Sequence, residues 1–92
     1  MLKLKNAEKE YEVSNCFESI TWTENRKEKL LTVMLQDSAK SDFTNLVGQE
    51  IKAAITNNDI EIINLNDYRI KEITKNYNFD IGINVRFEKV AQ

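Results

Sequence analysis

The chain has no histidine, no proline, only two glycines and one cysteine among its 92 residues. Without histidine there is no Ser-His-Asp triad, no Cys-His nucleophile pair and no histidine metal ligand. Gly48 and Gly82 are too few to form a glycine-rich phosphate loop. The composition therefore predicts a protein that is not an enzyme, with no catalytic residues, no metal site and no cofactor.

Cys16 is the only thiol, so the fold cannot rest on an internal disulfide, and we expect Cys16 to be a packing residue. A chain of this kind fits synthesis in a reducing cytoplasm. The first five residues alternate apolar with charged side chains, unlike a signal peptide. No window approaches the ~18 apolar residues of a membrane span. We therefore expect a soluble protein, cytoplasmic when synthesised, that does not bind membranes.

The residues that are present argue for a folded chain. Hydrophobic residues make up 41% of the sequence and the formal net charge is only −2, whereas disordered chains are poor in branched apolar residues and strongly charged. A chain of this length fits one modest core. We predict a single globular domain over residues 1–92.

Alternation of apolar and polar residues predicts strands through the first part of the chain. Segments 2–5 and 11–13 indicate a hairpin, and segment 17–23 a further strand. The charged run 24–29 is expected to be a solvated turn. Segment 30–36 is apolar on both faces, which favours a central strand that is covered on both sides.

The next segment has the spacing of an amphipathic helix. A stripe at i, i+3, i+4, i+7, i+8, i+11 and i+12 is apolar except at Glu50, and it comprises Phe43, Leu46, Val47, Glu50, Ile51, Ala54 and Ile55. We favour a helix over 43–55 that starts at a Ser41 N-cap and covers strand 30–36. The alternative ends the helix at Gly48 and makes residues 51–55 a strand, paired through Asn57-Asn58 to the next segment.

The C-terminal third is again strand-like. Segment 60–65 is a short apolar run, segment 68–77 changes phase at a bulge near Glu72, and 81–88 alternates clearly after a turn at 78–80. The order β-β-β-β-α-β-β-β predicts an α+β fold. We expect an antiparallel sheet of about six to seven strands with one amphipathic helix packed on a face.

A basic surface is the first binding feature to consider. Residues that could share one C-terminal sheet face are Arg69, Lys71, Lys75, Tyr77, Phe79 and Arg86. Basic groups interleaved with aromatics are typical of single-strand binders. The chain nevertheless carries more acidic than basic residues, so nucleic acid is not the partner that we favour.

Three aromatic residues are the best candidates for a protein interface. Trp22, Tyr77 and Phe79 lie near predicted strand ends or turns, where complete burial is harder. Large aromatics are enriched at binding hot spots. We predict that these three residues contact a protein partner. The alternative is that their rings close the ends of the core.

The layout of the whole chain resembles a group of phage proteins. Its features are the hairpin at 4–13, the Glu18-Ser19 step, the strand at 31–35, and the closing segments 68–74 and 83–89. It is similar to small proteins encoded among the tail genes of phages and prophages of low-GC Gram-positive bacteria, and no functional residues carry over. The resemblance implies a structural or assembly role in the virion, with copies of the chain or other virion proteins as partners. The alternative is a phage-encoded inhibitor that binds and blocks a host defence enzyme.

Overall fold

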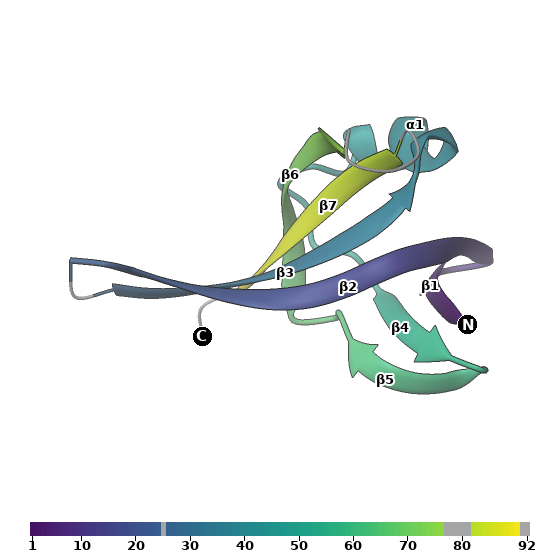
Figure 1. The fold of residues 1–92 in the computed structure, drawn as a ribbon, viewed down its shortest axis with the longest axis horizontal. Coiled ribbons are helices and arrows are strands. Elements are labelled where there is room, and N and C mark those ends of the chain that lie inside the picture. The colour runs from purple at the N-terminus through teal and green to yellow at the C-terminus, as the bar shows by residue number, and fades with distance from the viewer. Residues whose placement is uncertain (25, 77–81, 91–92) are drawn as a thin grey trace.

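The computed structural model describes residues 1–24, 26–76 and 82–90. Within them the chain forms seven strands, one 3-10 turn and one short helix (Figure 1). In chain order these are β1 (Leu2–Asn6), β2 (Lys9–Thr23), β3 (Arg26–Gln36), η1 (Asp37–Ala39), α1 (Lys40–Thr44), β4 (Ala53–Asn57), β5 (Ile60–Asn64), β6 (Tyr68–Asn76) and β7 (Gly82–Lys89).

All the strand pairs are antiparallel, and the strands follow the order β5-β4-β1-β2-β3-β7-β6. The 15-residue β2 joins two halves of the sheet. Its first residues pair with β1, and its remainder pairs with β3 after a register shift between Val13 and Asn15. Such a bulge increases the local twist, and here it lies where β2 passes from one half of the sheet to the other.

The sheet curls until its two ends approach one another. β5 and β6 stand at opposite ends of the strand order, yet only Leu65, Asn66 and Asp67 separate them in sequence. The Leu65 N–H donates to the carbonyl oxygen of Ala53, the first residue of β4, at 2.9 Å. On the far side, the Ile70 N–H of β6 donates to the Gln49 carbonyl oxygen at 3.2 Å. Residues 49–53, which end at the first residue of β4, therefore contact both ends of the sheet.

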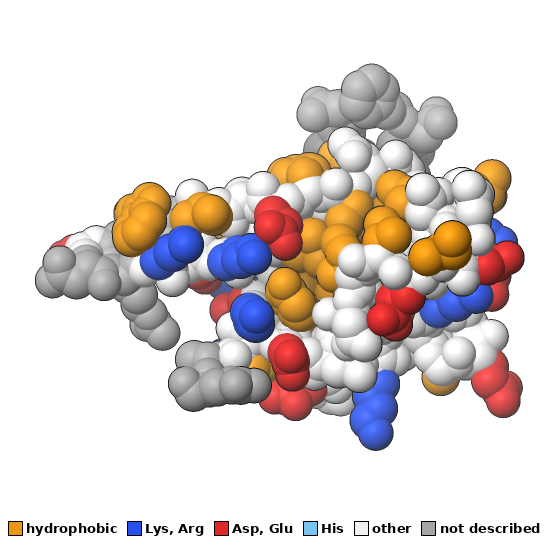
Figure 2. All heavy atoms as spheres, turned by 90° about the horizontal axis from the view of Figure 1, so that it is seen from below, with side chains coloured by type: hydrophobic (Ala, Val, Ile, Leu, Met, Phe, Trp, Pro, Cys, Tyr) orange, Lys and Arg blue, Asp and Glu red, His pale blue; other side chains and the backbone are white. Residues whose placement is uncertain are grey.

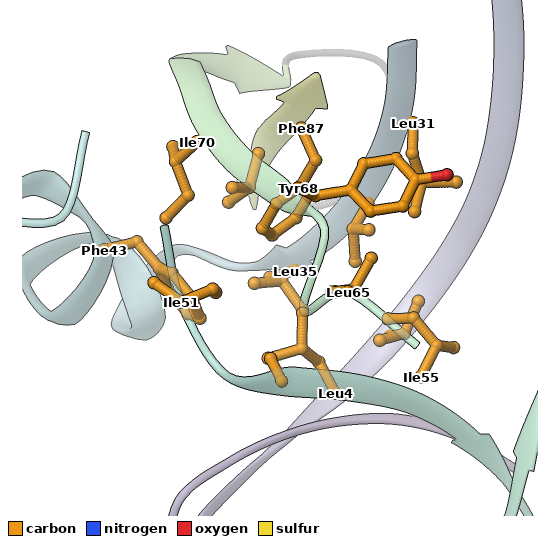
Figure 3. Packing of buried hydrophobic residues seen from close by; sticks show 14 of the residues in the cluster. Leu4, Leu31, Leu35, Phe43, Ile51, Ile55, Leu65, Tyr68, Ile70 and Phe87 are labelled. Carbon is orange, nitrogen blue, oxygen red and sulfur yellow. The ribbon is translucent and has the colours of Figure 1, made fainter. Parts of the chain in front are cut away.

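The core lies inside this curl (Figure 3). Alternate residues of β3 and β7 point inward, so the two halves of the sheet meet through side chains such as Leu4 and Ile55 on one side and Leu31 and Phe87 on the other. Each fully buried side chain of this size contributes roughly 1.5–3 kcal/mol. The largest ones that are fully buried are Phe43, Phe87, Leu4, Leu31, Leu35, Ile55, Leu65, Ile70, Ile83, Val33 and Val85.

The predicted α+β class, an antiparallel sheet with one helix, is confirmed, but the predicted helix over 43–55 is wrong. The helix ends at Thr44, and its N-cap is Ala39 rather than Ser41. Gly48 then adopts a φ of 85°, which a helix cannot accommodate. Residues 53–57 form β4, and Asn58 and Asp59, both at positive φ, turn the chain into β5. The alternative that made 51–55 a strand is close to the observed structure.

The helix also covers a different place from the one predicted. The Phe43 ring packs on Tyr11 with the ring centroids 4.9 Å apart and an interplanar angle of 59°. Phe43 belongs to the core, so α1 packs on the inside of the curled sheet and closes one end of it. The helix does not cover the second face of β3. On that face Thr32 is buried between Phe17 of β2 and Arg86 of β7, which lie opposite it in the register.

Two further expectations need correction. Segments 11–13 and 17–23 belong to one strand, β2, so that three strands rather than four precede the helix. The charged run 24–29 is not a solvated turn, because β3 already begins at Arg26 and continues the hairpin. The bulge near Glu72 is confirmed by a register shift between Ile70 and Glu72. The turn expected at 78–80 lies outside the described residues.

No helix in the described ranges combines the length and the apolar character needed to cross a membrane.

Candidate interaction surface

The outer part of the β2–β3 hairpin projects from the body of the molecule (Figure 1). We call residues 16–23 and 26–33 of this hairpin the arm; its base, which includes the buried residues Leu31 and Val33, belongs to the body, and its outer end projects. β1 pairs with β2 only as far as Glu12, and β7 pairs with β3 only from Leu30 onward. In the described part of the chain, the arm's β2 edge therefore has no neighbouring strand, and the tip of the arm is only two strands wide.

The arm exposes three large apolar side chains. Trp22 is 73% exposed, Ile20 is 52% exposed and Phe17 is 45% exposed. Because side chains alternate along a strand, Ile20 and Trp22 share one face and Phe17 lies on the other. These residues make the arm the most apolar exposed part of β2, in a position where the fold itself does not bury them.

Basic side chains lie beside the two apolar residues that share a face. In the register Lys29 is opposite Ile20, and Lys27 is opposite Trp22. The Lys27 Nζ atom lies 5.7 Å from the Trp22 ring centroid, within range of a cation–π contact. Lys29 in turn pairs with Glu18 at 3.5 Å. Figure 2 shows hydrophobic and basic side chains side by side along the arm, at the left of that view.

Of the three aromatics predicted from the sequence, only Trp22 lies among the described residues. Its exposure is what an interface residue requires, and its role stays a prediction. Tyr77 and Phe79 lie outside the described residues. The sequence did not lead us to predict Phe17 and Ile20 as interface residues. We expected the charged run 24–29 to be a turn, so the extension of the hairpin beyond the body was not predicted. The signal in the sequence that could have found the arm was the spacing by two of Ile20 and Trp22, which Lys27 and Lys29 repeat after residue 25.

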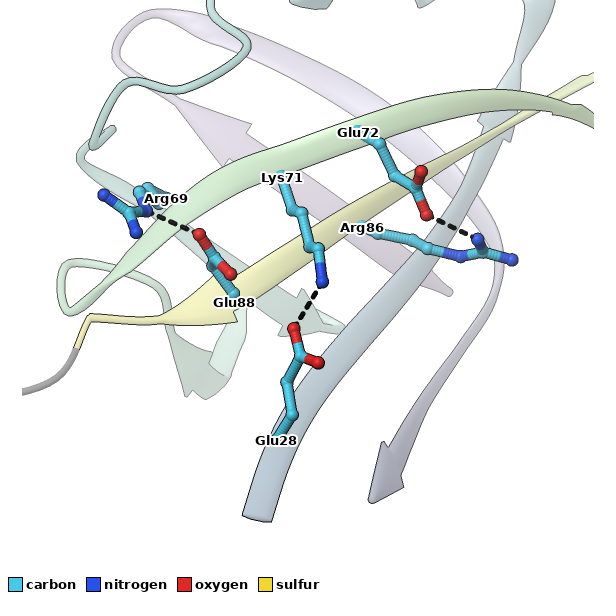
Figure 4. A network of polar contacts seen from close by, with 6 residues as sticks. All are labelled: Glu28, Arg69, Lys71, Glu72, Arg86 and Glu88. Atoms are coloured by element: carbon cyan, nitrogen blue, oxygen red, sulfur yellow. Dashed lines mark hydrogen bonds and ion pairs between the residues drawn. The ribbon is translucent and has the colours of Figure 1, made fainter. Parts of the chain in front are cut away.

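The predicted basic face carries as many acidic as basic groups (Figure 4). Arg69 Nε lies 2.6 Å from Glu88, Arg86 Nη1 lies 2.6 Å from Glu72, and Lys71 pairs with Glu28 of β3. The hydrogen bond to Glu28 raises the pKa of Lys71. Lys75 is opposite the core residue Ile83 and so lies on the other face of the sheet. This cross-strand network therefore offers no concentrated positive field to a phosphate backbone.

A second polar site lies between the first hairpin and the helix. The Tyr11 hydroxyl donates to Asp42 Oδ2 at 2.8 Å, and Lys9 Nζ lies 3.5 Å from the same oxygen. Burial and the hydrogen bond to Asp42 raise the pKa of Tyr11 to about 12. Tyr11 is therefore a protonated donor that holds α1 to β2. An open pocket beside it is lined by Asn6, Ala7, Glu8, Lys9, Tyr11, Asp42 and Leu46.

Cys16 packs against the core cluster, which confirms its expected packing role. Burial raises the pKa of its thiol, and the nearby Glu18 carboxylate acts in the same direction. A thiol with a raised pKa is a poor nucleophile at neutral pH. Among the residues that the structure describes, no three acidic or cysteine side chains are grouped as a metal ion would require.

Comparison with protein-family models, with curated proteins and with solved structures gives no match.

Proposed function

We propose that this chain is a non-enzymatic binding or assembly protein that contacts a protein partner through the arm. The observation that carries the proposal is the exposure of Trp22 at the end of a projecting hairpin. Single exposed apolar residues are normal on a protein surface. Here Ile20 and Trp22 lie together on one face of the arm and Phe17 is exposed on the other, and neighbouring exposed apolar side chains of this kind are typical of an interaction site.

The chemistry of the arm favours a protein over nucleic acid. A tryptophan offers a large apolar area at little entropic cost, and its truncation at a hot spot typically costs ~2 kcal/mol or more. Lys27 beside the ring adds a charge that can pair with a carboxylate at the rim of an interface. The chain has a net charge of −2, and Arg69 and Arg86 are each paired with a glutamate. General attraction to phosphates is therefore weak.

The more specific form of the proposal is a tail-associated role in a phage or prophage particle. Its support is the resemblance in sequence layout, together with a projecting hairpin that exposes apolar side chains. The alternative, an inhibitor of a host defence enzyme, would use the same arm on a different target. The identity of the captured partner separates the two: virion proteins in one case, a host enzyme in the other.

The test compares one exposed aromatic with one buried aromatic. Trp22→Ala is expected to keep the wild-type free energy of unfolding within ~0.5 kcal/mol, because its ring is largely exposed. It is also expected to weaken binding to the captured partner more than tenfold. Phe43→Ala is the control, and it should lose ~3–5 kcal/mol of stability. The measurements are chemical denaturation and quantitative pull-down from the native host, read by mass spectrometry.

Unchanged binding by a folded Trp22→Ala variant would show that the arm is not the interface. The same measurements on Tyr77→Ala and Phe79→Ala complete the prediction made from the sequence.

A further inference from the structure

The sheet has one long edge that no described residue pairs with. In the described part of the chain, β2 has no partner on one side from Ser14 to Thr23. The only charged residue along this stretch is Glu18, and it contains no lysine or proline. Natural sheets usually block exposed edges with charges, proline or short strands, because an open edge is a template for another strand.

The two outermost strands of the sheet contrast with this edge. β5 is only five residues long and carries Glu61. β6 carries Lys71 and Lys75, and its first part exchanges main-chain hydrogen bonds with the segment before β4, where Gly48 N–H donates to the Ile70 oxygen at 2.7 Å. The edge of β2 is therefore the place in this sheet most open to strand addition.

We propose that this β2 edge pairs in antiparallel fashion with the same edge of a second copy of the chain. The two arms would then form a continuous four-stranded sheet around a two-fold axis near Ser19. The inference rests on the proposed function, which makes the arm the binding surface, and it names the partner as a second copy.

This register places no two like charges directly opposite one another. With the axis at Ser19, Glu18 of one copy lies opposite Ile20 of the other, and Cys16 lies opposite Trp22. The two Glu18 side chains are only diagonal neighbours across the axis, and each is already paired with Lys29 of its own copy. An axis at Glu18 would instead place two carboxylates directly opposite each other. Because the contact is isologous, every favourable pair forms twice. The charge of Glu18 thus disfavours the register with its axis at Glu18 and is compatible with the register with its axis at Ser19.

The area also fits a reversible dimer. Each copy contributes Phe17, Ile20 and Trp22, which the fold leaves about half to three-quarters exposed. A fully buried aromatic side chain covers roughly 150–250 Å². Edge pairing covers only part of the area that the fold leaves exposed, so these side chains and the two main chains together give an interface of at most about 1,000 Å², the lower bound for specific association. We therefore expect a dimer whose population depends on protein concentration.

The experiment uses the full chain and a pair of matched variants. Ile20→Glu keeps a favourable cross-strand neighbour within the monomer, because position 20 is opposite Lys29. In the dimer it places a second carboxylate opposite Glu18 of the other copy. Ile62→Glu on β5 is the control, since Ile62 has the same exposure of 52%. Sedimentation equilibrium should show a wild-type dimer, at least a tenfold weaker one for Ile20→Glu, and no change for Ile62→Glu.

Cross-linking checks the geometry. In a Cys16→Ser background, Ser19→Cys should join two copies through a short thiol cross-linker, while Ile62→Cys should not. A wild-type chain that stays monomeric at high concentration would overturn the proposal, as would a dimer that ignores Ile20→Glu or fails to cross-link through position 19. The proposed function would survive that result if Trp22→Ala still lost a partner captured from the host.

Discussion

Tyr11 links the helix to the sheet through a single side chain. Its ring packs on Phe43 in the core, and its hydroxyl donates to Asp42 in the first turn of α1. The environment favours the neutral phenol of Tyr11. Burial disfavours the charged phenolate, and the Asp42 carboxylate accepts a hydrogen bond that only the protonated hydroxyl can donate. The negative charge of Asp42 would also repel a phenolate. One residue therefore makes the position of α1 dependent on a proton.

This arrangement predicts a loss of stability at alkaline pH. The folded-state pKa of Tyr11 is about 12, against about 10 for an unfolded chain, so the contribution is complete below pH 10 and is lost as the pH rises to about 12. Tyr11→Phe keeps the ring contact but removes the hydroxyl, and it should cost about 1 kcal/mol at neutral pH. The free energies of unfolding of the wild type and of Tyr11→Phe, each measured as a function of pH, should approach one another between pH 10 and 12. A constant difference across that range would contradict the assigned pKa.

At the scale of elements, strands were more predictable than the helix. A strand that buries one face must alternate, and β7 alternates from Ile83 to Phe87, so its position could be predicted. The bulge before Glu72 could be predicted because it moves the apolar residues to the other phase. What alternation cannot show is where a strand continues through polar residues, and for that reason the true lengths of β2 and β3 were missed.

The segment from Phe43 to Ile55 satisfied two patterns at once. Phe43 and Leu46 have helical spacing, and both contact the core. Ile51, Ala53 and Ile55 are also spaced by two, and within residues 51–55 these three are the buried ones, as in a strand. Both patterns share apolar positions, so the period alone could not separate them. Gly48 between the two parts was the residue that marked the boundary.

Gly48 therefore has a testable role in the turns that follow α1. Its φ of 85° is disfavoured for residues with a Cβ atom, although a Cβ added there would meet no atom within 4 Å. Gly48→Ala should cost about 1–2 kcal/mol through backbone strain alone. Gly48→Asn is the matched control and should cost less, because asparagine enters the left-handed region more readily. Chemical denaturation measures both, and an Ala variant as stable as wild type would show that this conformation is not required.

The arm illustrates how far the candidate site could be predicted. An exposed tryptophan near the end of a strand could be expected from the sequence, and Trp22 lies there. The unpaired edge of β2 could not be expected, because it depends on where β1 and β7 stop pairing. Those limits follow from the curl of the sheet, which brings together segments far apart in the chain.

At the scale of the whole molecule, two sheet halves share one strand and one core. β2 runs through both halves, and the buried cluster takes side chains from each. Leu65 lies between β5 and β6, at the point where the chain crosses from one half to the other. Its side chain is fully buried, and its N–H donates to Ala53. Neither half has a separate core, so we expect residues 1–92 to unfold as one cooperative unit.

Leu65→Ala tests this cooperativity. Truncation of a fully buried leucine should cost ~2–5 kcal/mol, and Leu65→Val gives a milder version if the alanine variant does not fold. Ile60→Ala is the control, since Ile60 is 69% exposed and should change stability by only ~0.5 kcal/mol. In native-state hydrogen exchange, Leu65→Ala should lower the free energy of opening by the same amount at the Ile55 amide in β4 and at the Val85 amide in β7. Both amides are expected to exchange only when the shared core unfolds. If Ile55 lost protection while Val85 kept it, the two halves would be separate folding units.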